Sequence, residues 1–119
     1  MNENAKKWVA ALRSGEFEQG QTQLRNGDAY CCLGVACELF RRETGLGRWD
    51  ESRDFEFRIS EDDFAGAVLP DAVAEWLGMG GNPWGAYGSA DLTTANDNDA
   101  TFDEIADIIE SEPEGLFNG

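Results

Sequence analysis

The sequence predicts a single small α+β domain that is mainly helical, with about three principal helices around one buried central helix and a short hairpin or strand pair. The 119 residues suit one domain, and a hydrophobic fraction of 41% is enough for a packed core. Two further stretches repeat apolar residues at the helical spacing, and an Asn-Gly dipeptide indicates a hairpin turn. A buried helix, amphipathic helices and a local strand pair together favour the α+β class.

The central helix is predicted over about residues 31–44, which follow Tyr30 and begin CCLGVACELF. Eight of the ten residues from 31 to 40 are apolar or cysteine, so apolar side chains fall all round a helical wheel. Such a helix is expected to be buried on most sides. Arg41 and Arg42 in its last turn suit the negative end of the helix dipole, and Gly45 supplies the stop.

Before this helix, residues 2–14 predict the first helix, with Asn2 or Asn4 as its N-cap and Gly15 as its stop. The dipeptide Asn26-Gly27 predicts a hairpin in which residues 22–25 pair with residues 28–31. The alternative is an ordered loop.

After the central helix, residues 55–59 alternate as a short strand would, and Ser60 followed by Asp63 has the form of a capping box that opens a turn or short helix. Residues 70–77 predict another helix, with Pro70 at its start. Residues 82–100 are rich in Gly, Asn and Asp and predict a long loop.

The last helix is the clearest. Thr101 and Glu104 form a capping box, and Phe102, Ile105 and Ile109 repeat at the helical spacing. The tail after Pro113 is expected to dock through its apolar residues.

Charge is distributed unevenly along the chain. The formal net charge is −15, and all nine Lys and Arg lie at or before Arg58. Residues 59–119 carry fourteen acids and no base, so we expect no direct nucleic-acid binding by this half. The sequence has no apolar run long enough to span a bilayer and no signal-peptide pattern, so we expect a cytoplasmic protein.

Several blocks carry a resemblance to a family. They are KWVAALRSG at residues 7–15, Gln19-Gly20, YCCLGVACELF at residues 30–40, LPDAVAEWLG at residues 69–78, and Asn96-Asp97 followed by TFDEIADIIE. The chain resembles a family of small uncharacterised proteins from phages and prophages. This resemblance implies a phage or prophage origin, and so the cytoplasm of an infected or lysogenic host, but no reaction. The chain departs from the family pattern at Ala95 and at Asn98-Asp99.

The sequence contains one candidate for a nucleophilic thiol and one for a metal site. A thiolate of Cys31 or Cys32 at a helix N-terminus could be a nucleophile, with Gln19 as a possible oxyanion donor. The sequence contains no His to act as base, which favours buried, reduced thiols. The run Asp97-x-Asp99-x-Thr101 resembles the start of a calcium loop, but it lacks the Gly and Glu that complete one. We therefore predict no metal and no cofactor.

A second candidate site is a nucleotide pocket, because aromatic rings and cations suit a phosphate-bearing ring compound. The residues that could line it are Trp49, Trp84, Tyr87, Arg13 and Gln19. The alternative is that the aromatic side chains fill gaps over the core.

The favoured hypothesis is a non-enzymatic, phage-encoded binding protein whose acidic face engages a basic surface of a host protein. The nucleic-acid-binding surface of a defence nuclease or CRISPR effector would suit it, since carboxylates can occupy sites prepared for phosphates. The predicted partner-binding residues are Glu61, Asp62, Asp63, Asp97, Asp99, Asp103, Asp107 and Glu110. The nucleotide pocket is the alternative function, a cysteine-dependent enzyme comes last, and adaptation to high salt is a competing explanation of the acidity.

Overall fold

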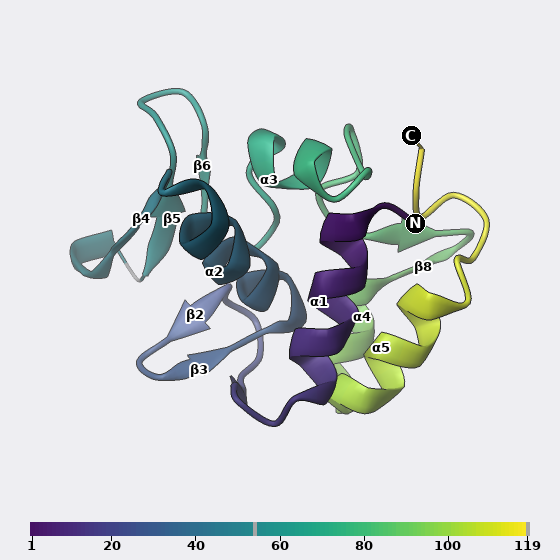
Figure 1. Cartoon of the computed structure of the whole chain (residues 1–119). Coiled ribbons are helices and arrows are strands. Elements are labelled where there is room, and N and C mark those ends of the chain that lie inside the picture. The colour runs from purple at the N-terminus through teal and green to yellow at the C-terminus, as the bar shows by residue number, and fades with distance from the viewer. Residues whose placement is uncertain (54, 119) are drawn as a thin grey trace.

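The computed structural model describes residues 1–53 and 55–118, and it confirms a small α+β domain that is mainly helical (Figure 1). The helices of the described residues are α1 (Glu3–Arg13), α2 (Cys32–Thr44), the short 3-10 helix η1 (Glu51–Arg53), α3 (Asp71–Trp76), α4 (Leu92–Asp97) and α5 (Phe102–Glu110). The strands are β1 (Glu18–Gln19), β2 (Arg25–Asn26), β3 (Ala29–Tyr30), β4 (Arg48–Asp50), β5 (Glu56–Arg58), β6 (Phe64–Ala65), β7 (Ala86–Tyr87) and β8 (Ala90–Asp91).

The strands form three small sheets around the helices. In the first sheet β3 lies between β1, to which it is parallel, and β2, to which it is antiparallel. The second sheet is antiparallel in the order β4-β5-β6, and β7 pairs with β8 in the third. Figure 1 shows α1 between α2 and α5, with the second sheet at the opposite side of the molecule from α5.

Helix α2 is buried as predicted, and its close approach to neighbours depends on a small residue. A Cβ atom at Gly34 would lie 1.7 Å from the carbonyl oxygen of Leu24, so only glycine permits this contact. The indole of Trp8 on α1 is fully buried and donates a 2.9 Å hydrogen bond to the carbonyl oxygen of Cys32. These contacts fix α2 against the backbone just before β2 and against α1.

One charged side chain of α2, Glu38, is also buried, and its carboxylate is fully engaged. It accepts hydrogen bonds from Arg41 (2.6 and 2.9 Å), Arg42 (2.9 Å) and the indole of Trp49 (3.0 Å). Burial alone would raise the pKa of Glu38, but these hydrogen bonds outweigh it and lower the pKa to about 2. The ionised carboxylate therefore joins α2 to strand β4.

The helix ends follow their local sequence signals. Asn2 caps α1 by accepting a hydrogen bond from the backbone N–H of Ala5, and Thr101 and Glu104 form the predicted capping box of α5. The chain after α5 docks as expected, since Leu116 is fully buried.

Two local predictions need correction, and one pair of alternatives is decided. The loop predicted over residues 82–100 instead contains β7, β8 and α4, because Leu92 anchors the segment in the core and Asp91 caps α4 through the N–H of Thr94. At Ser60, where a turn or a short helix was predicted, the structure has the turn, which joins β5 to β6 because Asp63 is hydrogen-bonded back to the strand end. The predicted hairpin is present, but its strands are only two residues long and Asn26 belongs to β2, opposite Ala29.

None of the helices formed by residues 1–53 and 55–118 has the length and apolar character needed to cross a membrane.

The burial of α2 predicts unequal effects for two neighbouring substitutions. Phe40 is 4% exposed and packs edge-on against Phe57 and Trp76, whereas Leu39 is only partly buried. We expect Phe40→Ala to lower the free energy of unfolding by about 3–5 kcal/mol. Leu39→Ala, the matched control, should cost clearly less. Urea denaturation measures both, and a loss below about 1 kcal/mol for Phe40→Ala would contradict a central role of this helix.

The low pKa of Glu38 predicts an acid-sensitive contribution to stability. A carboxyl whose folded pKa is about 2, against an ordinary 4.5, stabilises the fold when ionised, above pH 4.5. That contribution is lost as the pH falls from about 4.5 towards 2. Glu38→Gln should therefore be less stable than the parent at pH 7 and should lose less stability between pH 5 and pH 2.5. Equal losses in both proteins would show that the Glu38 cluster does not contribute.

Candidate functional site

A buried polar junction centred on Asn96 joins three distant parts of the chain. The Asn96 side chain is 1% exposed, and its Oδ1 accepts hydrogen bonds from Nε2 of Gln19 (3.0 Å) and from the backbone N–H of Cys32 (3.2 Å). Its Nδ2 donates to the carbonyl oxygen of Gly20 at 2.7 Å. The blocks Gln19-Gly20, the start of α2 and Asn96-Asp97, which carried the family resemblance, therefore meet at one amide.

The junction continues to the surface, where it ends in a polar hollow of about 410 Å³ lined by Gln19, Gly20, Gln21 and Asp99. Nε2 of Gln21 donates to the Asp99 carboxylate (2.8 Å), and the backbone N–H of Thr22 donates to Asp97 (2.8 Å). Both predicted acidic residues of this loop thus hold the neighbouring segment in place.

Two residues beside this hollow have left-handed backbone conformations that non-glycine residues rarely adopt: Thr22 at φ 68° and Asp99 at φ 70°. For a β-branched residue such as Thr22 this conformation is strained by roughly 1–2 kcal/mol. The hydrogen bonds to Asp97 and Asp99 hold this conformation. The same contacts occupy the run that resembles the start of a calcium loop, and no group of three or more potential metal-ligating side chains gathers among the described residues.

The cysteines are free and buried, in agreement with the sequence-based interpretation. Cys31 occupies the N-cap position of α2 without a side-chain capping hydrogen bond, and desolvation raises the pKa of its thiol to about 11. Burial raises the pKa of Cys32 and Cys37 well above the ordinary value. Thiolates are therefore disfavoured at neutral pH. The predicted oxyanion donor, Gln19, is instead occupied by Asn96 and by the carbonyl oxygen of Ala100.

Helix α5 presents the predicted acidic face. Its exposed side holds Asp103, Asp107 and Glu110, opposite a buried face that packs on α1. One cation approaches: Nη2 of Arg13 on α1 lies 2.8 Å from Asp107 and 2.7 Å from Glu110. The hydrogen bonds to Asp107 and Glu110 raise the pKa of Arg13. Arg13 therefore belongs to the acidic face and not to the predicted aromatic pocket.

The second acidic cluster, Glu61 to Asp63, does not extend this face. It forms the turn between β5 and β6, on the opposite side of the molecule from α5 (Figure 1). Asp63 caps α3 by accepting hydrogen bonds from the N–H groups of Asp71 (2.8 Å) and Ala72 (3.0 Å). Glu61 and Asp62 are exposed at the turn.

The aromatic residues predicted to share a pocket are also dispersed. Trp49 on β4 packs against Tyr30 and Phe57, whereas Tyr87 lies on β7, which pairs with β8 on the far side of α1 (Figure 1). Trp84 is 54% exposed. No single hollow found among the described residues is lined by these three rings. The aromatic residues were predicted from composition, which carries no information about which sheet each joins.

Comparison with known proteins places the chain in a family. The model of DUF8296, a domain of unknown function, matches residues 1–113. The chain belongs to the DUF8296 family. No curated protein and no solved structure matches it significantly. The match covers α1 through α5, so the Asn96 junction and the acidic face both lie within the family domain.

Sequence reasoning missed Asn96 as a structural centre, and it missed the pairing of Arg48 with Arg58 across β4 and β5. A signal for Asn96 was its spacing four residues after Leu92, on the inner face of a short helix. The sequence shows charged and aromatic residues alternating near Arg48, but the residue that lies opposite Arg48 depends on strand register in the sheet.

The junction predicts a strong effect of removing one amide. Asn96→Ala leaves the Cys32 N–H and the Gly20 carbonyl without their partner and removes one of the two acceptors of the Gln19 amide. Each unmet buried group costs about 1–3 kcal/mol. We expect a loss of at least about 2 kcal/mol in the free energy of unfolding, measured by urea denaturation. Asn98→Ala, an exposed neighbour, should change stability little. Equal effects of the two substitutions would rule out the junction as a central contact.

Proposed function

We propose that the chain is a non-enzymatic binding protein whose acidic face, formed by Asp103, Asp107 and Glu110 on α5, engages a basic surface of a partner protein. The observation that carries this proposal is the exposure of these three carboxylates along one helix face. Asp107 and Glu110 retain 72% and 54% exposure of their side chains although both contact Arg13. A partner can therefore reach them without unfolding the helix.

The charge balance supports the same proposal. Two carboxylates face one guanidinium, and Asp103 has no cationic partner among the described residues, so the face keeps a net negative charge. Opposite potentials speed encounter and select partners, mainly through long-range steering. The tail adds Glu114, which is exposed. A surface that binds nucleic-acid phosphates is cationic and is therefore complementary to this face, whose repeated carboxylates resemble repeated phosphates in charge.

A non-enzymatic role is supported by the thiols. Desolvation raises the pKa of all three cysteines, which disfavours the thiolate that a cysteine nucleophile requires. The sequence offers no His to act as a base. In its narrower form the proposal adds three points: a phage origin, a host defence protein as the partner, and a site of action in the host cytoplasm.

Neutralising the face should weaken partner binding. A lysate of a bacterial host is passed over the immobilised protein at low salt, the partner is eluted by salt and purified, and its affinity is measured directly. Asp103→Asn, Asp107→Asn and Glu110→Gln together should reduce affinity at least tenfold at low salt. The difference should shrink at high salt, because screening shortens the range of exposed charges to about 8–10 Å at physiological ionic strength.

The control variant removes the same number of charges elsewhere: Glu61→Gln, Asp62→Asn and Glu75→Gln are all exposed and lie off α5. It should bind like the parent protein. Equal weakening by both triple variants would indicate a general charge effect and overturn the assignment to α5. The melting temperature should change little in either variant, because exposed ion pairs such as those of Arg13 contribute little to stability.

A further inference from the structure

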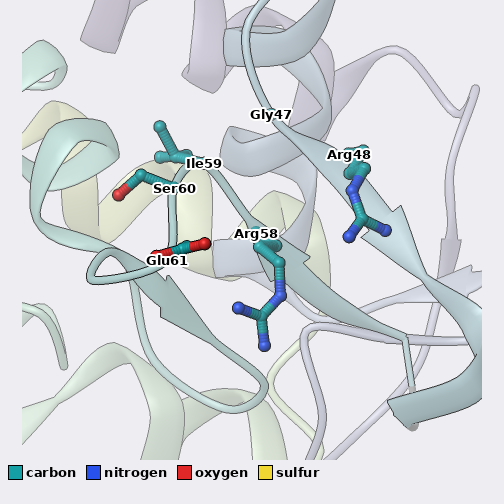
Figure 2. Close-up of a pocket in the computed structure, with 6 residues that line it drawn as sticks. All are labelled: Gly47, Arg48, Arg58, Ile59, Ser60 and Glu61. Carbon is teal, nitrogen blue, oxygen red and sulfur yellow. The ribbon is translucent and has the colours of Figure 1, made fainter.

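A separate hollow of about 320 Å³ lies on the outer side of the second sheet, away from α5. It is lined by Gly47, Arg48, Arg58, Ile59, Ser60 and Glu61 (Figure 2). Figure 2 shows the guanidinium groups of Arg48 and Arg58 extending in the same direction from adjacent strands. The hollow thus brings together two cations in a chain whose net charge is −15.

The charges on this outer face are separated rather than alternated. Arg48 lies directly opposite Arg58, and Asp50 lies directly opposite Glu56. Between them Trp49 opposes Phe57, and Phe57 is fully buried, so the two charged pairs share the outer face. Like charges directly opposite each other destabilise a strand pair. The carboxylates of Glu56 and, at a longer distance, Asp50 offset part of this repulsion, and a bound anion would offset more of it.

The carboxylates beside the arginines leave most guanidinium donors available. Arg58 donates one hydrogen bond of 2.7 Å to Glu56, and Arg48 approaches Asp50 only at 3.8 Å. Among the described residues no other acceptor receives a hydrogen bond from these two side chains. Each guanidinium has five N–H donors, so both can bind a further anion.

Packing fixes the orientation of one of the two groups. Arg58 lies over the ring of Phe64, its neighbour on β6, at 4.3 Å from the ring centre, and its side chain is 21% exposed. The guanidinium is thereby held against an aromatic face, which limits the entropy lost on binding. Arg48, at 66% exposure, is open to solvent beside it.

We infer that this hollow binds a small molecule through a phosphoryl group. Two guanidinium groups arriving from neighbouring strands match the charge and the several oxygens of a phosphate monoester, and such pairs form charge-assisted, often bidentate hydrogen bonds. The volume is near the lower end of the range of about 300–1,000 Å³ typical of ligand pockets, which fits a compact ligand. Glu61 adds a carboxylate to the lining, which suits a ligand hydroxyl and disfavours a second phosphate.

The test titrates the isotope-labelled protein with inorganic phosphate, ribose 5-phosphate and AMP, and follows backbone amide shifts by NMR. Saturable shifts are expected at residues 47, 48 and 58–61. Tighter binding of AMP than of ribose 5-phosphate identifies a nucleotide as the source of the phosphoryl group, and equal binding identifies a sugar phosphate. Absence of saturable shifts at these residues with all three probes overturns the proposal.

Matched variants separate a built site from general electrostatics. Arg48→Gln with Arg58→Gln should weaken binding of the best probe at least tenfold, whereas Lys6→Gln with Lys7→Gln removes the same charge from α1 and should leave it unchanged. Glu61→Gln should strengthen binding, and Glu114→Gln, with the same change in net charge, should not. Equal effects within either pair overturn the proposal. If the double arginine variant fails to fold, Arg48→Gln alone, at an exposed position, makes the same comparison against Lys6→Gln.

Discussion

The enclosure of α2 on nearly all sides is the constraint on which the rest of the structure depends. Helices and strands can approach α2 closely because its side chains are small where they meet. The closest approach is at Gly34, against the backbone of Leu24. Enclosure also means that every polar group nearby needs a partner. Glu38 obtains its partners from Arg41, Arg42 and Trp49, and the Cys32 N–H obtains its own from Asn96. No buried side-chain nitrogen or oxygen of the described residues lacks a hydrogen bond.

The acidity of the second half has two separate physical roles. Many of its carboxylates complete the fold: Asp63 and Asp91 cap helices, and Asp97 holds the backbone of Thr22 in a strained conformation. These groups accept hydrogen bonds from neutral N–H donors, so they organise the backbone without cancelling their charge. The carboxylates on the outer side of α5 contribute little to the fold and are the ones available to a partner.

The two candidate binding regions differ in sign and in position. The face of α5 is anionic and convex, on a helix, whereas the hollow beside Arg48 and Arg58 is cationic and lies on a strand pair at the other side of the molecule (Figure 1). A Debye length of about 8–10 Å at physiological ionic strength lets each region act through its local charges. Strand register places Arg48 beside Arg58 at one end of the strand pair and the acidic residues at the other end. This local separation of charge makes an anion site possible although the chain as a whole is acidic.

The sequence by itself determined the elements that depend on local physics. The apolar run at residues 31–40 predicts α2, and the capping residues Asn2 and Thr101 predict where α1 and α5 begin, because a cap acts within one turn. The charge imbalance is likewise a property of composition.

The tertiary structure alone decided which residues lie beside each other. Residues 82–100 look like a loop until Leu92 is buried by elements far away in the chain. Arg13 meets Glu110 because α1 packs on α5, and Arg48 meets Arg58 because strand register places them opposite each other. Long-range pairing of this kind depends on closing the chain around a shared core, and no local pattern encodes it.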